Sequence, residues 1–112
     1  MNSSAIHDAV VVKNKGEIRR IAFQDIIYIE KSLRKIFFHL SSEVFCTYGK
    51  FDMYVVDLPE EFYLCSRSYI INLSKVIIMK DQTIYFVDGK DIRIGRDKFY
   101  GARKAYSAFI AE

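Results

Sequence analysis

The sequence predicts a mostly β fold of short antiparallel strands that ends in a helix. Polar, proline and glycine-containing breaks cut the chain into short pieces, which is typical of strands. Asp88-Gly89 lies between two β-prone runs, Thr83 to Val87 and Ile92 to Ile94, and favours the positive φ angles of a tight hairpin turn. From Asp97 onward, apolar residues recur at helical spacing.

The expected elements follow in chain order. Residues 1–8 are expected to form a flexible tail and 9–112 one domain, because 112 residues fall within the usual size of a single domain. Short apolar runs predict strands at Ala9 to Lys13, Glu17 to Ala22, Ile26 to Glu30, Lys35 to Leu40, Glu43 to Tyr48, Phe62 to Cys65, Lys75 to Met79, Thr83 to Val87 and Asp91 to Ile94.

Other segments favour helical geometry. Phe23 to Asp25 fits one helical turn, and Met53 to Leu58, which Pro59 ends, fits a short helix. Tyr69 to Leu73 fits either a strand or a turn of helix. The C-terminal helix is expected to have Asp97 as its N-cap and to bury one face, made of Phe99, Ala102, Tyr106, Phe109 and Ile110.

Composition and charge indicate a soluble globular protein. Hydrophobic residues make up 51% of the chain, yet no apolar run approaches the roughly 20 residues that span a bilayer. The start, MNSSAIHDAV, lacks the features of a signal peptide, so we expect a cytoplasmic location. The net charge of +3 is compatible with a polyanion partner if the charges segregate, and basic clusters do occur around Lys31 to Lys35 and Arg93 to Lys98.

Residues for catalysis, metal binding or a cofactor are not arranged in any recognisable spacing. His7, His39, Cys46 and Cys65 are scattered, and the phosphate-binding glycine motifs are missing. We therefore expect no enzyme, no metal site and no cofactor. Both cysteines are expected to be buried, reduced thiols, and His39 to lie at the surface of a sheet.

Three segments in order resemble the LytTR DNA-binding family: IAFQDIIYIEKSLRKIFFHL, LPEEFYLCSRSYIINLSKV and IYFVDGKDIRIGRDKF. They span nearly all of the chain from about Glu17 to Phe99, and the string Ser66 to Asn72 is the most specific. The resemblance implies an elongated arrangement of small packed sheets. It also implies sequence-specific binding of double-stranded DNA, within a bacterial transcription regulator, through loops that enter the major groove.

The resemblance also implies which residues contact DNA. The base-contacting positions of the family fall here on Arg34, Arg67 and Arg96, and the guanidinium fork matches guanine O6 and N7. Phosphate contacts are expected from their neighbours Lys31, Lys35, Ser66, Ser68, Tyr69 and Lys98.

Three positions differ from the family pattern, and several other residues are expected to have structural roles. Leu64 and Ser66 stand where the family often has a basic residue and a histidine, and Gly95 stands where a serine is common. Asn72 is expected to bind turn backbone rather than DNA. The core is expected to contain Tyr28, Ile29, Phe38, Phe62, Ile70, Ile71 and Phe86.

Two other functions stay open at this point. One is a protein-interaction or sensory β module with the same fold and weakened DNA contacts; the other is binding of single-stranded nucleic acid by a small barrel. For the DNA-binding hypothesis, the expected partners are duplex DNA, a second copy of the chain on repeated sites, and an upstream receiver domain if the chain is a fragment of a larger regulator.

Overall fold

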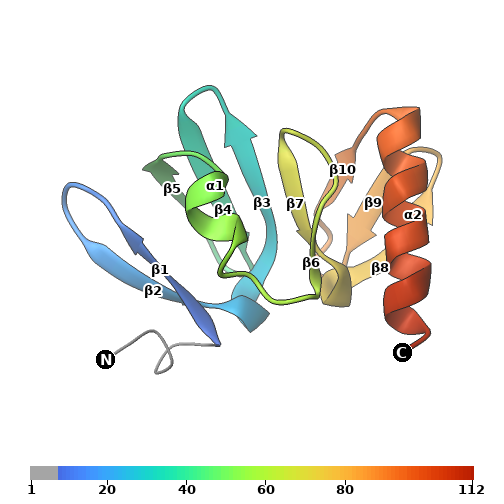
Figure 1. The fold of residues 1–112 in the computed structure, drawn as a ribbon, viewed down its shortest axis with the longest axis horizontal. Coiled ribbons are helices and arrows are strands. Elements are labelled where there is room, and N and C mark those ends of the chain that lie inside the picture. Colours follow the sequence, from blue (N-terminus) through green and yellow to red (C-terminus); the bar gives the residue numbers. More distant parts are fainter. Residues whose placement is uncertain (1–7) are drawn as a thin grey trace.

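The computed structural model describes residues 8–112, which form ten strands and two α-helices (Figure 1). The strands are β1 (Ala9–Lys13), β2 (Ile18–Ala22), β3 (Ile26–Ser32), β4 (Lys35–Leu40), β5 (Val44–Tyr48), β6 (Phe62–Leu64), β7 (Tyr69–Asn72), β8 (Val76–Lys80), β9 (Thr83–Phe86) and β10 (Asp91–Arg93). The helices are α1 (Asp52–Val55) and α2 (Arg96–Ile110). Short 3₁₀ turns, Phe23–Asp25 and Leu73–Lys75, lead into β3 and β8.

The strands form three antiparallel sheets that lie along the longest dimension of the molecule. A hairpin of β1 and β2 is followed by a five-stranded sheet in the order β5-β4-β3-β7-β6 and a three-stranded sheet in the order β10-β9-β8. The extents are 41 × 32 × 25 Å, and Figure 1 shows the three sheets side by side with α2 at one end. The predicted fold class, an elongated set of small packed sheets closed by a helix, is confirmed.

Two hydrophobic clusters share the five-stranded sheet. One joins its β3–β5 part to the β1–β2 hairpin and α1; the other joins it to β8–β10 and α2. A bulge between Ile26 and Tyr28 lets β3 contribute residues to both clusters. Because of this bulge, the consecutive residues Ile27 and Tyr28 both belong to the second cluster, while Ile26 and Ile29 belong to the first.

Most predicted elements are present, with shifts of one or two residues at their ends. Tyr69 to Leu73, which fitted either strand or helix, is mainly strand β7. Asp97 is not the N-cap of the last helix, because α2 begins at Arg96, after Gly95. On this helix Phe99 and Ala102 are buried as expected, whereas Ile110 is exposed at its end.

Two residue-level predictions need correction. Cys65 is buried, but Cys46 is exposed because it alternates on β5 with the inward-facing Phe45 and Thr47. Phe62 is only half-buried, at the edge of the first cluster. Of the predicted tail, residues 1–7, including His7, lie outside the described part, while the Asp8 carbonyl accepts a hydrogen bond from the Phe23 N–H.

The tight turns also differ from the prediction. At Asp88-Gly89 only Gly89 has a positive φ, +90°, and the loop is the three-residue kind, in which the Gly89 N–H donates to the Phe86 carbonyl. The two-residue turn with two positive φ angles is Asp81-Gln82, between β8 and β9. Leu33, in the β3–β4 turn, has a φ of +57°, which is rare for a leucine.

Candidate nucleic-acid interface

The three segments that carry Arg34, Arg67 and Arg96 reach the same edge of the molecule. Figure 1 shows the β3–β4 turn, the β6–β7 loop and the start of α2 along its upper edge. The arrangement follows from topology, because β3 is antiparallel to both β4 and β7, so that its end, the start of β4 and the start of β7 meet at one end of the sheet.

Arg34 lies in a two-residue turn whose backbone is well fixed. Ser32 pairs with Lys35, which leaves Leu33 and Arg34 as the turn residues. The Lys31 ammonium donates to the Leu33 carbonyl at 3.1 Å, and the Gly49 N–H donates to the Arg34 carbonyl at 3.0 Å. Both carbonyl groups of the turn are therefore bonded, and the Arg34 side chain projects from a defined backbone.

Arg67 lies at the apex of a compact loop. The Tyr69 carbonyl accepts hydrogen bonds from the N–H groups of Cys65 and Ser66, and the Ser68 N–H donates to the Ser66 hydroxyl oxygen at 3.1 Å. The Lys31 N–H donates to the Ser68 carbonyl at 2.8 Å, which fastens this loop to the end of β3. Arg67 is thereby held beside the β3–β4 turn.

Arg96 is the first residue of α2. The sequence prediction placed it on a loop, whereas the structure places it in the first turn of a helix. Gly95, the N-cap, is extended and provides no side-chain hydrogen bond. Lys98 is exposed in the same turn, and its positive charge acts to lower the pKa of the Cys65 thiol. Burial nevertheless dominates at Cys65 and raises the pKa of the thiol to about 12.

A groove of about 690 Å³ lies between Arg34 and Arg67. Its floor and walls are largely apolar, and Lys31 and Lys50 add positive charge while Asp52 adds one carboxylate. Gly49 also lines the groove. Its φ is +154°, and a Cβ atom there would lie 3.1 Å from the Met53 sulfur. The remaining lining residues are Leu33, Tyr48, Phe51 and Leu64.

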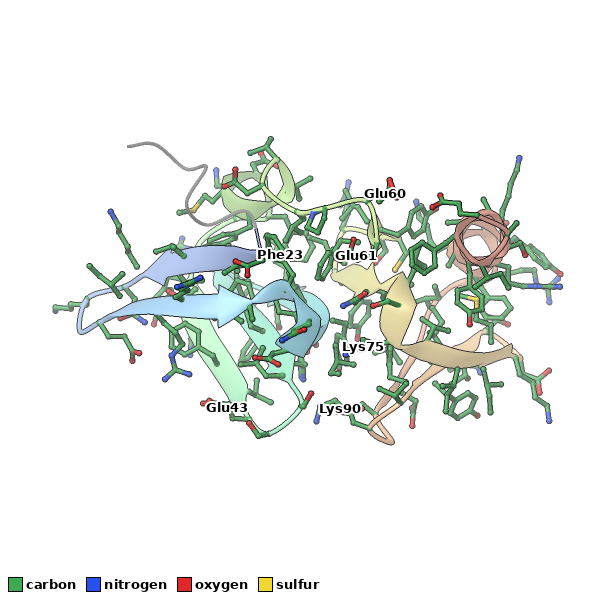
Figure 2. All side chains as sticks on the ribbon, turned by 90° about the horizontal axis from the view of Figure 1, so that it is seen from below. Phe23, Glu43, Glu60, Glu61, Lys75 and Lys90 are labelled. Atoms are coloured by element: carbon green, nitrogen blue, oxygen red, sulfur yellow. The ribbon has the colours of Figure 1, made fainter. Side chains whose placement is uncertain are left out.

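The three arginines are exposed and free of acidic partners within residues 8–112. The salt bridges of this part of the chain involve Arg19, Arg20, His39 and Lys90 instead. Figure 2, seen from the opposite edge, shows Glu43, Glu60 and Glu61 there, together with Lys75 and Lys90. The edge that carries Arg34, Arg67 and Arg96, here called the arginine edge, thus lies opposite an edge on which acidic and basic side chains are mixed.

The residues expected to contact phosphate occupy varied positions on this edge. Lys35 is exposed, with its ammonium 5.7 Å from the centre of the Tyr48 ring, and Ser68 is exposed next to Arg67. Ser66 uses its hydroxyl oxygen as an acceptor within the loop. Tyr69 is half-buried with its ring against Tyr28, and burial raises the pKa of its hydroxyl group.

Of the residues that line the groove, the sequence prediction named only Lys31, Arg34 and Arg67 as contact residues, and Leu33 and Lys50 are among those that it missed. Lys50 follows the Gly49 break that ends β5, so a basic residue after a turn was the only available signal. Leu33 gave no signal, because leucine ordinarily belongs to a core, yet its side chain is 89% exposed.

Other polar groups have structural roles. His39 Nε2 lies 2.8 Å from the Glu30 carboxylate oxygen, which accepts its hydrogen bond, and the ring stacks on Tyr28, so His39 is half-buried on the sheet. Within residues 8–112, no three His, Cys, Asp or Glu side chains gather in a way that could hold a metal ion. In the same part of the chain, no helix is long and apolar enough to cross a membrane.

Comparison with known proteins identifies the family. The model of the LytTr DNA-binding domain matches residues 16–107, which is most of the chain and includes all three arginine segments. The chain belongs to the LytTR DNA-binding domain family. The resemblance of the three sequence segments is thereby confirmed, and the family is one of DNA-binding domains.

A solved structure has the same LytTR fold. It is a LytTr DNA-binding domain from Bacillus cereus, named as part of a methyl-accepting/DNA response regulator. It is 17% identical to this chain, with a TM-score of 0.72, and the match covers 88% of this chain and 95% of that one. None of the curated proteins compared with the chain matches it. The structural likeness thus supports the fold, while the family model supports the assignment to LytTR.

Proposed function

We propose that this LytTR domain binds double-stranded DNA sequence-specifically as part of a bacterial transcription regulator, with Arg34, Arg67 and Arg96 contacting bases in the major groove. The observation that carries the proposal is the placement of three exposed arginines on one edge, each from a different segment and none with an acidic partner among the described residues 8–112. Three separate protrusions on one edge can each bring a side chain to the bases on one face of a duplex.

The chemistry of the edge suits duplex DNA. A guanidinium group donates two parallel hydrogen bonds to guanine O6 and N7, and the major groove is wide enough for a two-stranded ribbon such as β3–β4. Lys31, Lys35 and Lys98 flank the arginines and, with Ser66, Ser68 and Tyr69, are proposed to bind phosphate oxygens, which fixes register without specifying sequence.

Selection of binding sites from random duplex DNA, followed by anisotropy titrations, tests the proposal. We expect an enriched site that binds much more tightly than a scrambled duplex of the same composition. Replacing Arg19, which is held by Glu17 and Glu43 away from this edge, provides a matched arginine control that keeps full affinity. Absence of enrichment, or equal affinity for both duplexes, would contradict sequence-specific binding.

An interaction or sensory module is the second candidate. It is favoured by the apolar lining of the groove, where Tyr48, Phe51 and Leu64 offer a surface more typical of protein contacts than of phosphate contacts. If the purified domain binds neither selected nor scrambled duplexes at low salt, this second function replaces the first.

The domain bounds, the location and the partners of this LytTR domain are also part of the proposal. Residues 9–112 are proposed to form the DNA-binding unit of a cytoplasmic protein, with a second copy binding on repeated sites and a receiver domain upstream where the chain is part of a longer regulator. Sedimentation of the domain with duplexes containing one or two copies of the selected site distinguishes monomeric from paired binding.

A further inference from the structure

We propose that Leu33 contacts the methyl group of a thymine in the bound DNA and so contributes to base specificity beside Arg34. The inference rests on the proposed function and adds an apolar base contact to it. Leu33 is the first residue of the β3–β4 turn, directly before Arg34, and its side chain is 89% exposed. It is the most exposed large hydrophobic residue in the described part of the chain.

The backbone at Leu33 is unfavourable for its side chain. A φ of +57° lies in the left-handed region, where glycine and asparagine are common and a bulky side chain is rare. The fold does not require leucine for packing, because Leu33 is so exposed. A residue that is both strained and exposed is typical of a contact site, since function can maintain what stability alone disfavours.

Hydrogen bonds also hold the backbone of this turn in a defined position. The carbonyl of Leu33 accepts from the Lys31 ammonium, and that of Arg34 accepts from the Gly49 N–H. The Leu33 side chain borders the groove beside Arg34 and Arg67, and also a smaller hollow that includes Phe37 on the other side of the turn. It therefore forms an exposed apolar ridge between two hollows, on a turn whose backbone requires little ordering when DNA binds.

The chemistry of the major groove provides one apolar group for such a ridge. The C5-methyl group of thymine projects into the groove, and apolar side chains contact it there. Because Arg34 is the adjacent residue, a duplex that places the Arg34 guanidinium on a guanine brings Leu33 near a neighbouring base pair. A Leu33 contact would thus specify a thymine close to the Arg34 guanine.

Uracil substitution tests the contact directly, because uracil differs from thymine by this methyl group alone. Each thymine of the selected site is replaced in turn by uracil, and affinities of the wild-type chain, Leu33→Ala and Leu33→Asn are compared. We expect one thymine at which uracil weakens wild-type binding about fourfold, the change that corresponds to ~0.8 kcal/mol for one buried carbon group. At that position both variants should bind thymine and uracil duplexes equally.

Controls separate this contact from general effects. Asparagine adopts positive φ readily, so Leu33→Asn preserves the turn while it removes the apolar side chain. Ile18→Ala removes another exposed apolar side chain, 70% exposed on β2, and should keep the full uracil effect.

The outcomes distinguish the two proposals. If no duplex is selected, the proposed function itself fails. If a site is selected and bound but no uracil substitution weakens wild-type binding, or if the variants keep the uracil effect, the Leu33 contact is overturned while DNA binding stands.

Discussion

The side-chain amide of Asn72 donates a 2.9 Å hydrogen bond to the carbonyl oxygen of Ile26, where the pairing of β3 with β7 ends. The backbone pairing of these two strands stops at Tyr28 and Ile71, so the Asn72 side chain extends the contact between them to the Ile26 carbonyl. The Asn72 carbonyl oxygen accepts from both the N–H and the hydroxyl group of Ser74. This buried asparagine thus joins the central sheet to the 3₁₀ turn before β8.

Replacement of Asn72 by alanine is expected to destabilise the fold by about 2 kcal/mol, because it leaves the Ile26 carbonyl buried without a partner. Chemical denaturation followed by circular dichroism measures the change. Ser74→Ala removes the hydroxyl group that donates to the Asn72 carbonyl oxygen but leaves the hydrogen bond between Asn72 and Ile26, so it should cost less than half as much. Equal losses for both variants would show that the Ile26 hydrogen bond is not the main contribution.

Much of the fold could be predicted from local sequence, and Asn72 shows why. An asparagine at the end of an apolar strand has few roles other than binding turn backbone, so the residue type and its position were sufficient to predict what Asn72 does. Cys46 shows the opposite case. Cysteine is usually buried, but the pairing of Phe38 with Phe45 sets the alternation of β5 and turns Cys46 outward.

The candidate site was less predictable because it depends on long-range pairing. The basic residues at strand ends could be located in the sequence, but the groove requires β4–β5 and β6–β7 to be brought to the two sides of β3. The exposure of Leu33 likewise follows from the two-residue turn that the register of β3 and β4 imposes. Neither register is encoded in a local motif.

Thiol labelling of the native protein should distinguish the two cysteines. Cys46 is exposed and Cys65 is buried, with its thiol bonded to the Tyr69 carbonyl at 3.4 Å. A chromogenic disulfide reagent is therefore expected to modify one thiol per chain rapidly, and the second only after denaturation. Cys46→Ser should abolish the rapid phase, and a rapid phase that persists in this variant would contradict the burial of Cys65.

The stability of the fold should decrease at alkaline pH, partly through Cys65. Burial raises the pKa of this thiol from 9.0 to about 12. Between these values the folded chain keeps a proton that the unfolded chain has released, so the stabilisation is complete below pH 9 and is lost as the pH rises toward 12. The expected loss from this group is about 1 kcal/mol per pH unit.

Urea denaturation of the wild-type chain and Cys65→Ala between pH 8 and pH 11 measures this contribution. The variant starts from a lower stability because it loses packing, but its stability should fall less steeply with pH. Cys46→Ala serves as the control and should keep the wild-type slope. If stability falls equally steeply with pH in wild type and in Cys65→Ala, the loss of stability at alkaline pH comes from other groups. Tyr28 is one of these groups, because burial raises the pKa of its hydroxyl group to about 12.

Substitution of Arg67 or Arg96 by alanine should weaken binding to the selected site by about 1 to 3 kcal/mol and relax selectivity at one base position each. The reason is that a bidentate contact to guanine is lost, while the phosphate contacts remain. Repeated site selection with each variant identifies the relaxed position. If selectivity is retained and affinity falls equally on selected and scrambled duplexes, these arginines bind phosphate and the assignment to bases is wrong.

Substitution of Lys35 or Lys98 by alanine should have a different signature. A phosphate contact carries no sequence information, so its loss should weaken selected and scrambled duplexes alike. It should also reduce the slope of log affinity against log salt concentration by roughly one unit, because one fewer counterion is released from the DNA. Titrations at four or more salt concentrations give this slope for each duplex.

Lys75, which lies on the opposite edge in Figure 2, provides the matched control, and Lys75→Ala should keep the wild-type slope. An equal change in slope for Lys75→Ala would mean that the overall charge of the chain, and not the arginine edge, determines the salt dependence.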